Sequence, residues 1–220
     1  MHQITEPAIL YFGTPVVLIS TENENGTFNI APMSSVFWLG WRCIIGLGTR
    51  SKTSANLIRM KECVLNLPSV NEVRAVNRLA LTTGVNPVPP VKQRRGYRYE
   101  PDKFAISGLT PISSDIVSIP GIEECPVRLE ATVAKVHPVA EEDETLRGGI
   151  VSFELKIIRV HIEKTILVDG EPNRIDPDKW RPLIMSFQQF YGLGEKIHSS
   201  TLAQISEHLY RAPVQVENQE

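Results

Sequence analysis

The sequence lacks the features that mark several classes of protein. It has three cysteines among 220 residues and no Cys-x-x-Cys pair, so we predict no disulfide framework and a reducing compartment. No apolar run approaches the roughly 20 residues that cross a bilayer. The first residues lack the charged and apolar regions of a signal peptide. The sequence therefore predicts a cytoplasmic protein with no membrane partner.

Positive charge is not in excess either. Lys and Arg number 23 against 25 Asp and Glu, which leaves a net charge of −2, whereas a nucleic-acid-binding surface favours a basic stripe. The one basic cluster, KQRR at residues 92–95, lies beside a proline-rich stretch and is predicted to be a solvated loop. We therefore expect no nucleic-acid partner.

The familiar catalytic motifs are absent as well. The sequence contains no His-Glu-x-x-His, no metal-ligand spacing of Cys and His, no Gly-x-Ser-x-Gly and no phosphate-binding P-loop. Glu130 and Glu154 lie in predicted strands and could pair as acid and base, but outward-facing strand positions are the favoured interpretation. We predict no metal site and name no catalytic residue.

What the sequence does contain is a series of β-strand patterns with few helices. We predict strands at residues 15–21, 27–32, 42–48, 63–68, 126–137 and 150–162, and helices at residues 52–62, 71–84 and 201–210. Regular alternation of strand and helix is missing. This order favours an antiparallel barrel with helical decoration over a doubly wound parallel sheet.

Several boundaries follow from single residues. Pro32 is expected to stop its strand because proline cannot donate to a ladder, and Gly84 is expected to end the second helix. In the last long strand the apolar positions change phase between Ile157 and Ile158, which predicts a β-bulge. Residues 85–104, with four prolines, are predicted to form a long loop.

The stretch TRSKT at residues 49–53 lies between a predicted strand and a predicted helix. A helix N-terminus offers free N–H groups and about half a positive charge, which suits an anion. Ser51 or Thr53 is a natural N-cap. From spacing alone, a phosphate site and an ordinary capped helix with solvated Arg50 and Lys52 are equally supported.

Several motifs in order extend this interpretation. PVVLIST, GTFNIAPMS, SKTSANL and VLNLP, followed by YEPDKFAISGLTPISS, ECPVRLEATV and YGLG, resemble the FMN-binding split barrel of the flavin reductase-like (flavoredoxin-like) family over residues 15–194. The resemblance implies one domain over residues 1–220, mainly β with helices and built as an antiparallel Greek-key split β-barrel. Residues 170–220 would form a C-terminal arm and helix.

The resemblance also implies a cofactor site for FMN. The backbone at residues 31–34 would lie along the flavin ring, residues 50–53 would hold the phosphate, and an aromatic residue near the C-terminus would approach the ring from the partner in a homodimer. The cofactor-binding residues predicted in this way are Asn29, Ala31, Pro32, Ser34, Ser35, Thr49, Arg50, Ser51, Lys52, Thr53 and Tyr191.

Three functions stay open at this point. The leading prediction is an FMN-dependent oxidoreductase, a flavin reductase that takes electrons from NAD(P)H or another small-molecule donor. The second is an electron-transfer or flavin-carrier protein without NAD(P)H activity. The third is an oxygenase-associated enzyme acting on a small molecule, in which the basic and aromatic loop at residues 85–104 would hold an anionic group.

The sequence departs from the family pattern in two places. The C-terminal arm WRPLIMSFQQFYGLG at residues 180–194 has few glycines and more bulk than the family pattern. WLGW at residues 38–41 stands where the family carries a turn with Asp and Pro. Its tryptophans could wall the flavin pocket, but core or interface aromatics are the favoured interpretation.

Overall fold

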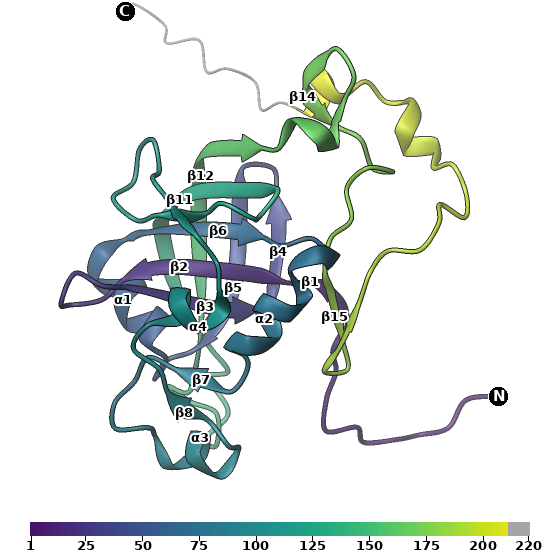
Figure 1. The fold of residues 1–220 in the computed structure, drawn as a ribbon. Helices are drawn as coiled ribbons and strands as arrows, with labels where there is room; N and C mark the ends of the chain where they lie inside the picture. Colours follow the sequence, from purple (N-terminus) through teal and green to yellow (C-terminus); the bar gives the residue numbers. More distant parts are fainter. Residues whose placement is uncertain (211–220) are drawn as a thin grey trace, which may run out of the picture.

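The computed structural model of the protein describes residues 1–210, and a curled seven-stranded antiparallel sheet forms its centre (Figure 1). The strand order is β3-β2-β6-β11-β12-β5-β4. The bounds are β2 Val17–Glu22, β3 Phe28–Met33, β4 Val36–Leu39, β5 Arg42–Gly48, β6 Glu62–Leu67, β11 Val127–Val139 and β12 Ile150–Ile162. No pairing joins the edges β3 and β4 in the part of the chain that is described. The barrel is therefore split, as predicted.

The inner face of the sheet forms the main core. On β11, the alternate residues Val127, Leu129 and Ala131 are buried, and Phe153 of β12 is fully buried among them. The three cysteines, Cys43, Cys63 and Cys125, are buried and free.

The predicted β-bulge is present where the two longest strands pair. Glu130 lies opposite Arg159, whereas the next residue, Ala131, lies opposite Ile157. Ile158 is therefore the extra residue on β12. The bulge explains why the buried phase of β12 changes at this point.

The prediction that Pro32 ends its strand is wrong. Strand β3 continues to Met33, and Pro32 lies opposite Leu18 of β2. Because β3 is an edge strand, a residue there can turn its nitrogen away from the ladder without removing a sheet hydrogen bond.

Helix α1 (Lys52–Met60) begins as predicted, with Ser51 as its N-cap. Helix α2 (Val73–Leu79) ends earlier than predicted, before Ala80. Gly84 is therefore no helix stop. It follows the short strand β7 (Thr82–Thr83), which pairs in parallel with β8 (Arg98–Tyr99).

Residues 85–104 do not form the long irregular loop that the prolines suggest. They contain the short helix α3 (Pro90–Arg94), strand β8 and the start of helix α4 (Lys103–Ser107). Pro90 suits the first turn of α3, where no backbone donor is needed, and the Asp102 side chain caps α4. In Figure 1, β7, β8 and α3 lie together below the barrel, and α4 packs on α2 and β3.

The remaining elements are short. They are β1 (Phe12–Pro15), β9 (Pro111–Ile112), β10 (Gly121–Ile122), β13 (Leu167–Val168), β14 (Glu171–Ile175), β15 (Ile184–Ser186), β16 (Gln189–Tyr191) and 3-10 helices at Val70–Glu72, Lys164–Ile166, Thr201–Gln204 and Glu207–Tyr210.

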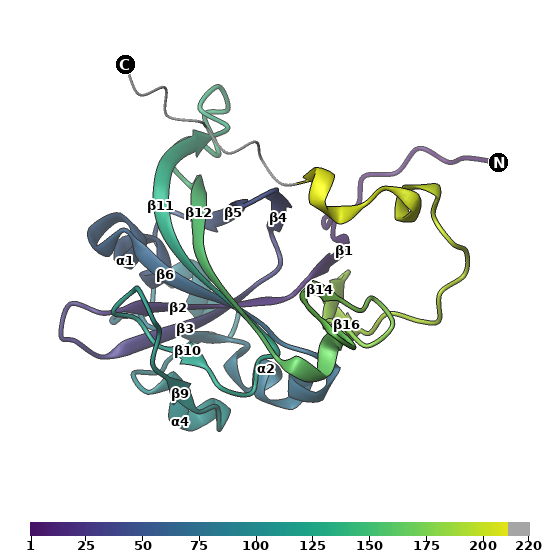
Figure 2. The same ribbon diagram turned by 90° about the horizontal axis from the view of Figure 1, so that it is seen from above.

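The C-terminal segment leaves the barrel as an extended arm (Figures 1 and 2). Two 3-10 turns, Thr201–Gln204 and Glu207–Tyr210, stand where the sequence predicts one helix. The rest of the predicted arm, residues 211–220, lies outside the described residues. Among the helices described, none is long and apolar enough to cross a membrane.

Candidate functional site

A buried polar cradle forms where β3 meets the start of α1. The Asn29 Nδ2 donates to the Thr53 Oγ1 at 3.2 Å, and both side chains are buried. The Asn29 Oδ1 is also buried, yet within residues 1–210 it has no hydrogen-bond donor. Because a buried acceptor without a donor is unfavourable, this atom marks a place where a ligand donor fits.

Gly84 leaves the space that this acceptor faces. A Cβ atom at this position would lie 2.9 Å from the Asn29 Oδ1 and 3.0 Å from the Lys52 Cγ. The backbone of Gly84 does not have a positive φ, so the need for glycine is one of space. Any other residue at position 84 would fill the cradle.

The N-terminus of α1 supplies the donors of the site. The Ser51 Oγ accepts from the backbone N–H of Ser54 at 3.0 Å. The N–H groups of Lys52 and Thr53, in the first turn, have no acceptor in the helix itself. The first turn carries no acidic residue, and Lys52 adds a positive charge that is paired with Glu24 at 2.9 Å. This arrangement suits an anion.

Thr49 and Arg50, two predicted residues of the TRSKT stretch, make no hydrogen bond to the cradle residues within residues 1–210. The Thr49 Oγ1 donates to the backbone oxygen of Gly148 at 2.8 Å, and thus ties β5 to the turn before β12. The side chain of Arg50 is exposed. The structure therefore brings together Asn29, Lys52 and Thr53 with Ser51 as the helix cap.

The stretch after β3 offers backbone rather than side chains. Ala31 and Pro32 lie half-buried on the edge strand, Ser34 is half-buried and Ser35 is exposed. The carbonyl of Ser35 accepts from Gly46, but no hydrogen bond from the N–H groups of Ser34 and Ser35 is present in residues 1–210. Two free donors thus lie at the end of the strand that carries Asn29.

Tyr191 is not joined to this cradle within the chain. It lies on β16, in the separate small sheet with β1 and β15, and is 56% exposed. Its predicted approach from a partner subunit stays a prediction. Of the two tryptophans in WLGW, Trp38 packs against the main core and Trp41 is exposed.

Sequence reasoning missed two lysines next to the cradle, Lys92 and Lys103. The Lys92 Nζ donates to the Thr83 Oγ1 at 3.2 Å. Thr83 directly precedes Gly84 in the sequence. Lys103 on α4 is only 4% exposed. Burial and then the positive charge of Lys92 lower its pKa to about 8. No pattern in the sequence distinguishes Lys103 from an ordinary exposed lysine, since buried lysines are rare.

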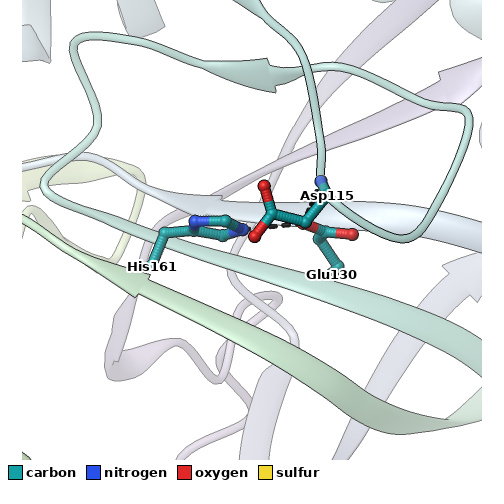
Figure 3. Close-up of side chains that lie close together, drawn as sticks. All are labelled: Asp115, Glu130 and His161. Carbon is teal, nitrogen blue, oxygen red and sulfur yellow. Dashed lines mark hydrogen bonds and ion pairs between the residues drawn. The ribbon is translucent and has the colours of Figure 1, made fainter.

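A second polar cluster lies on the outer face of the sheet, where Glu130 and His161 of β11 and β12 approach Asp115 (Figure 3). The Glu130 carboxylate lies on the outer face, as predicted, but it is fully buried there. It accepts hydrogen bonds at 2.7–2.9 Å from His161 Nε2 and from the backbone N–H groups of Asp115, Ile116 and Val117. Burial raises its pKa, but these bonds outweigh burial and lower the pKa to about 2.

This cluster anchors a loop rather than holding a metal or an acid–base pair. A carboxylate offers about four acceptor positions, and the four donors fill them, so none is free for a cation. Asp115 is paired instead with Arg159 at 3.7 Å. Glu154 lies opposite Lys135, several pairs along the ladder from Glu130, so the two glutamates form no pair.

The chain thus combines a split seven-stranded barrel with a polar cradle beside one edge strand. The flavin reductase-like domain model matches residues 9–194. The chain therefore belongs to the flavin reductase-like family, as the motifs predicted.

The chain is also similar to individual proteins, and the two solved structures, at 21% identity, show the shared fold. The chain is 38% identical over 192 residues to the uncharacterised protein YdfE of Bacillus subtilis (strain 168), covering 87% of this chain and 89% of that protein. Flavoredoxin of Desulfovibrio vulgaris (Miyazaki F) superimposes with a TM-score of 0.72 at 21% identity, over 92% of this chain and 99% of that one. Nitrilotriacetate monooxygenase component B of Bacillus cereus gives a TM-score of 0.69 at 21% identity, over 87% and 89%.

Proposed function

We propose that the protein is an FMN-dependent oxidoreductase, a flavin reductase that takes electrons from NAD(P)H. The observation that carries this proposal is the cradle at the start of α1. The cradle combines the unpaired Asn29 Oδ1, the space at Gly84 and the free donors of the first turn. The chain that carries it belongs to the flavin reductase-like family.

The residues present fit a flavin mononucleotide. The N–H groups of Lys52 and Thr53 and the Lys52 ammonium would hold the phosphate. The Asn29 Oδ1 would accept from a hydroxyl of the sugar-like chain, and the N–H groups of Ser34 and Ser35 would face the ring. When bound, FMN supplies the hydride chemistry, and the protein supplies position and electrostatics.

A chain that acts in this way needs no catalytic acid or base of its own. Backbone donors held in place favour negative charge on a neighbouring ring without reorganising, and alignment of two rings converts an encounter into an effectively intramolecular step. The edge strand β3 and the helix cap at Ser51 provide such fixed positions. This accounts for a site built from N–H groups and an amide rather than from a triad.

We also propose a homodimer. Large apolar side chains are exposed at the edge strand β4 and just beyond it: Phe37 is 52% exposed, Leu39 68% and Trp41 64%. Single exposed residues are ordinary, but a contiguous group on a sheet edge suits a partner surface. A partner subunit could then bring its own Tyr191 to this chain. A cytoplasmic location stays a prediction from the sequence.

The test is the absorbance spectrum of the purified protein after addition of FMN, followed by NADH and then NADPH. The proposal predicts a bound-flavin spectrum, bleaching by one or both donors, and steady turnover with excess free FMN. A protein that takes up no FMN would refute it. A protein that binds FMN but is bleached only by a partner reductase would be a flavin carrier.

A further inference from the structure

A small cavity lies where β11 begins and β12 ends. Its volume is about 150 Å³, which is the share of about five molecules in liquid water and is well below the roughly 300–1,000 Å³ of pockets for drug-sized ligands. Strands β2 and β6 separate β11 from β3, the strand that carries the cradle. The cavity therefore suits a ligand of a few non-hydrogen atoms and is distinct from the proposed flavin site.

The cavity has a charged rim and an uncharged floor. Of the residues that line it, Glu123 and Glu163 are exposed, Arg128 and His161 are half-buried, and Cys125 is buried. Burial raises the pKa of the Cys125 thiol well above its ordinary value. The thiol is therefore uncharged at neutral pH and acts as a small apolar group.

Arg128 brings a positive charge that the fold does not neutralise. Its guanidinium forms no ion pair within residues 1–210, although two carboxylates line the same cavity. The arginine stem occupies space that Gly121 leaves, because a Cβ atom added at Gly121 would lie 2.9 Å from the Arg128 Cδ. The fold thus fixes the stem of Arg128 and leaves the five N–H donors of its guanidinium for a ligand.

His161 offers the opposite kind of group, a hydrogen-bond acceptor. Its Nε2 lies 2.7 Å from a Glu130 oxygen, and since an ionised carboxylate only accepts, Nε2 carries the hydrogen. In the neutral imidazole the other nitrogen, Nδ1, is then an acceptor. Figure 3 shows this nitrogen turned away from Glu130 and Asp115. The buried glutamate thus sets both the tautomer and the orientation of a ring that lines the cavity.

We propose that this cavity binds a small neutral α-amino acid in its zwitterionic form. Arg128 holds the carboxylate through paired hydrogen bonds. The ammonium lies among the three acceptors, His161 Nδ1 and the carboxylates of Glu123 and Glu163. A simple anion is repelled by the two glutamates and a simple cation by Arg128, whereas a zwitterion satisfies both signs. The floor at Cys125 and the small volume favour a short aliphatic side chain.

The test is an amide NMR titration of the full chain with glycine, L-alanine and L-valine, in excess FMN so that the cradle is closed to small anions. Propionate and isopropylamine each keep one charge of the amino acid and serve as matched probes. At least one amino acid should bind about tenfold or more tightly than either probe, with shifts centred on residues 123–128 and 161–163. Arg128→Met should weaken this binding about tenfold or more. Lys135→Met, at an exposed position of the same strand, should leave it unchanged.

The double variant Glu123→Gln with Glu163→Gln separates a zwitterion site from a simple anion site. It keeps Arg128 but removes two negative charges, so the affinity for the amino acid should fall and that for propionate should rise. The proposal is overturned if none of the three amino acids binds, or if the shifts lie at the cradle instead. Propionate that binds the wild type as tightly as the amino acid also overturns it. If Arg128→Met does not fold, the double variant still decides.

Discussion

The buried glutamate on the outer sheet face offers the sharpest test of the structural interpretation. In Glu130→Gln, one carboxylate oxygen becomes an NH₂ group of nearly the same size. The two oxygens of Glu130 share four donors, three of them backbone N–H groups of residues 115–117. Whichever oxygen is replaced, at least one backbone donor loses its acceptor, and the negative charge that all four favour is gone.

Two quantities give the free energy of unfolding that Glu130→Gln should lose. A fall in the pKa of Glu130 from 4.5 to about 2 corresponds to roughly 3 kcal/mol of stability at neutral pH, at about 1.4 kcal/mol per tenfold change in proton affinity. An unsatisfied buried donor costs about 1–3 kcal/mol, and breaking a buried charged network costs about 3–5 kcal/mol. We therefore expect Glu130→Gln to lose about 3 kcal/mol.

The sign of the pH dependence follows from the lowered pKa. The contribution of Glu130 is fully present above its unfolded-state pKa, near 4.5, and is lost as the pH falls toward about 2. Urea unfolding of wild type and variant at pH 7, 5, 4 and 3 should show a gap of about 3 kcal/mol that narrows below pH 5.

The matched control is Glu154→Gln, on the same sheet. Its carboxylate is partly exposed and pairs with Arg42 at 3.3 Å, so the expected loss is at most about 1 kcal/mol. If Glu130→Gln costs no more than this control, or if its gap stays constant as the pH falls, the anchor assigned to Glu130 is wrong.

The remaining predictions concern the cradle and the dimer. Lys52→Ala and Thr53→Ala should each weaken FMN binding about tenfold or more, because the first removes the ammonium from the phosphate and the second removes the hydroxyl that positions Asn29; equal affinities in a fluorescence titration would contradict the assignment. Gly84→Ala should weaken FMN binding by filling the cradle, whereas Gly194→Ala, with no atom within 4 Å of the added Cβ, should not. Trp41→Ser should shift the protein toward monomer in light scattering, and an unchanged mass would argue against the β4 edge as the interface.

The sequence predicted the split barrel because its strands alternate clearly and its motifs follow the order of one family. The capping residue Ser51 also predicted the start of α1, and the change of apolar phase in the last long strand predicted the bulge at Ile158. The predictions at Pro32 and Gly84 failed for one reason: each residue was assigned the role that it has in an isolated segment. Pro32 is tolerated because β3 is an edge, and Gly84 is required by the approach of Asn29 from a distant strand. Neither fact is visible within a few residues of sequence.

The two buried ionisable residues show why the site itself was only partly predictable. Alternation along β11 points Glu130 to the outer face, which is correct, but a loop from residues 113–119 covers that face and supplies its donors. Lys103 is also buried, although no pattern within a few residues of it predicts this. Whether a strand or helix position can bury a charged group depends on partners that distant segments supply, so burial of such a group is not visible in the local sequence. Removing the Glu130 carboxylate should therefore lower stability without changing FMN binding, because its four donors all belong to the fold.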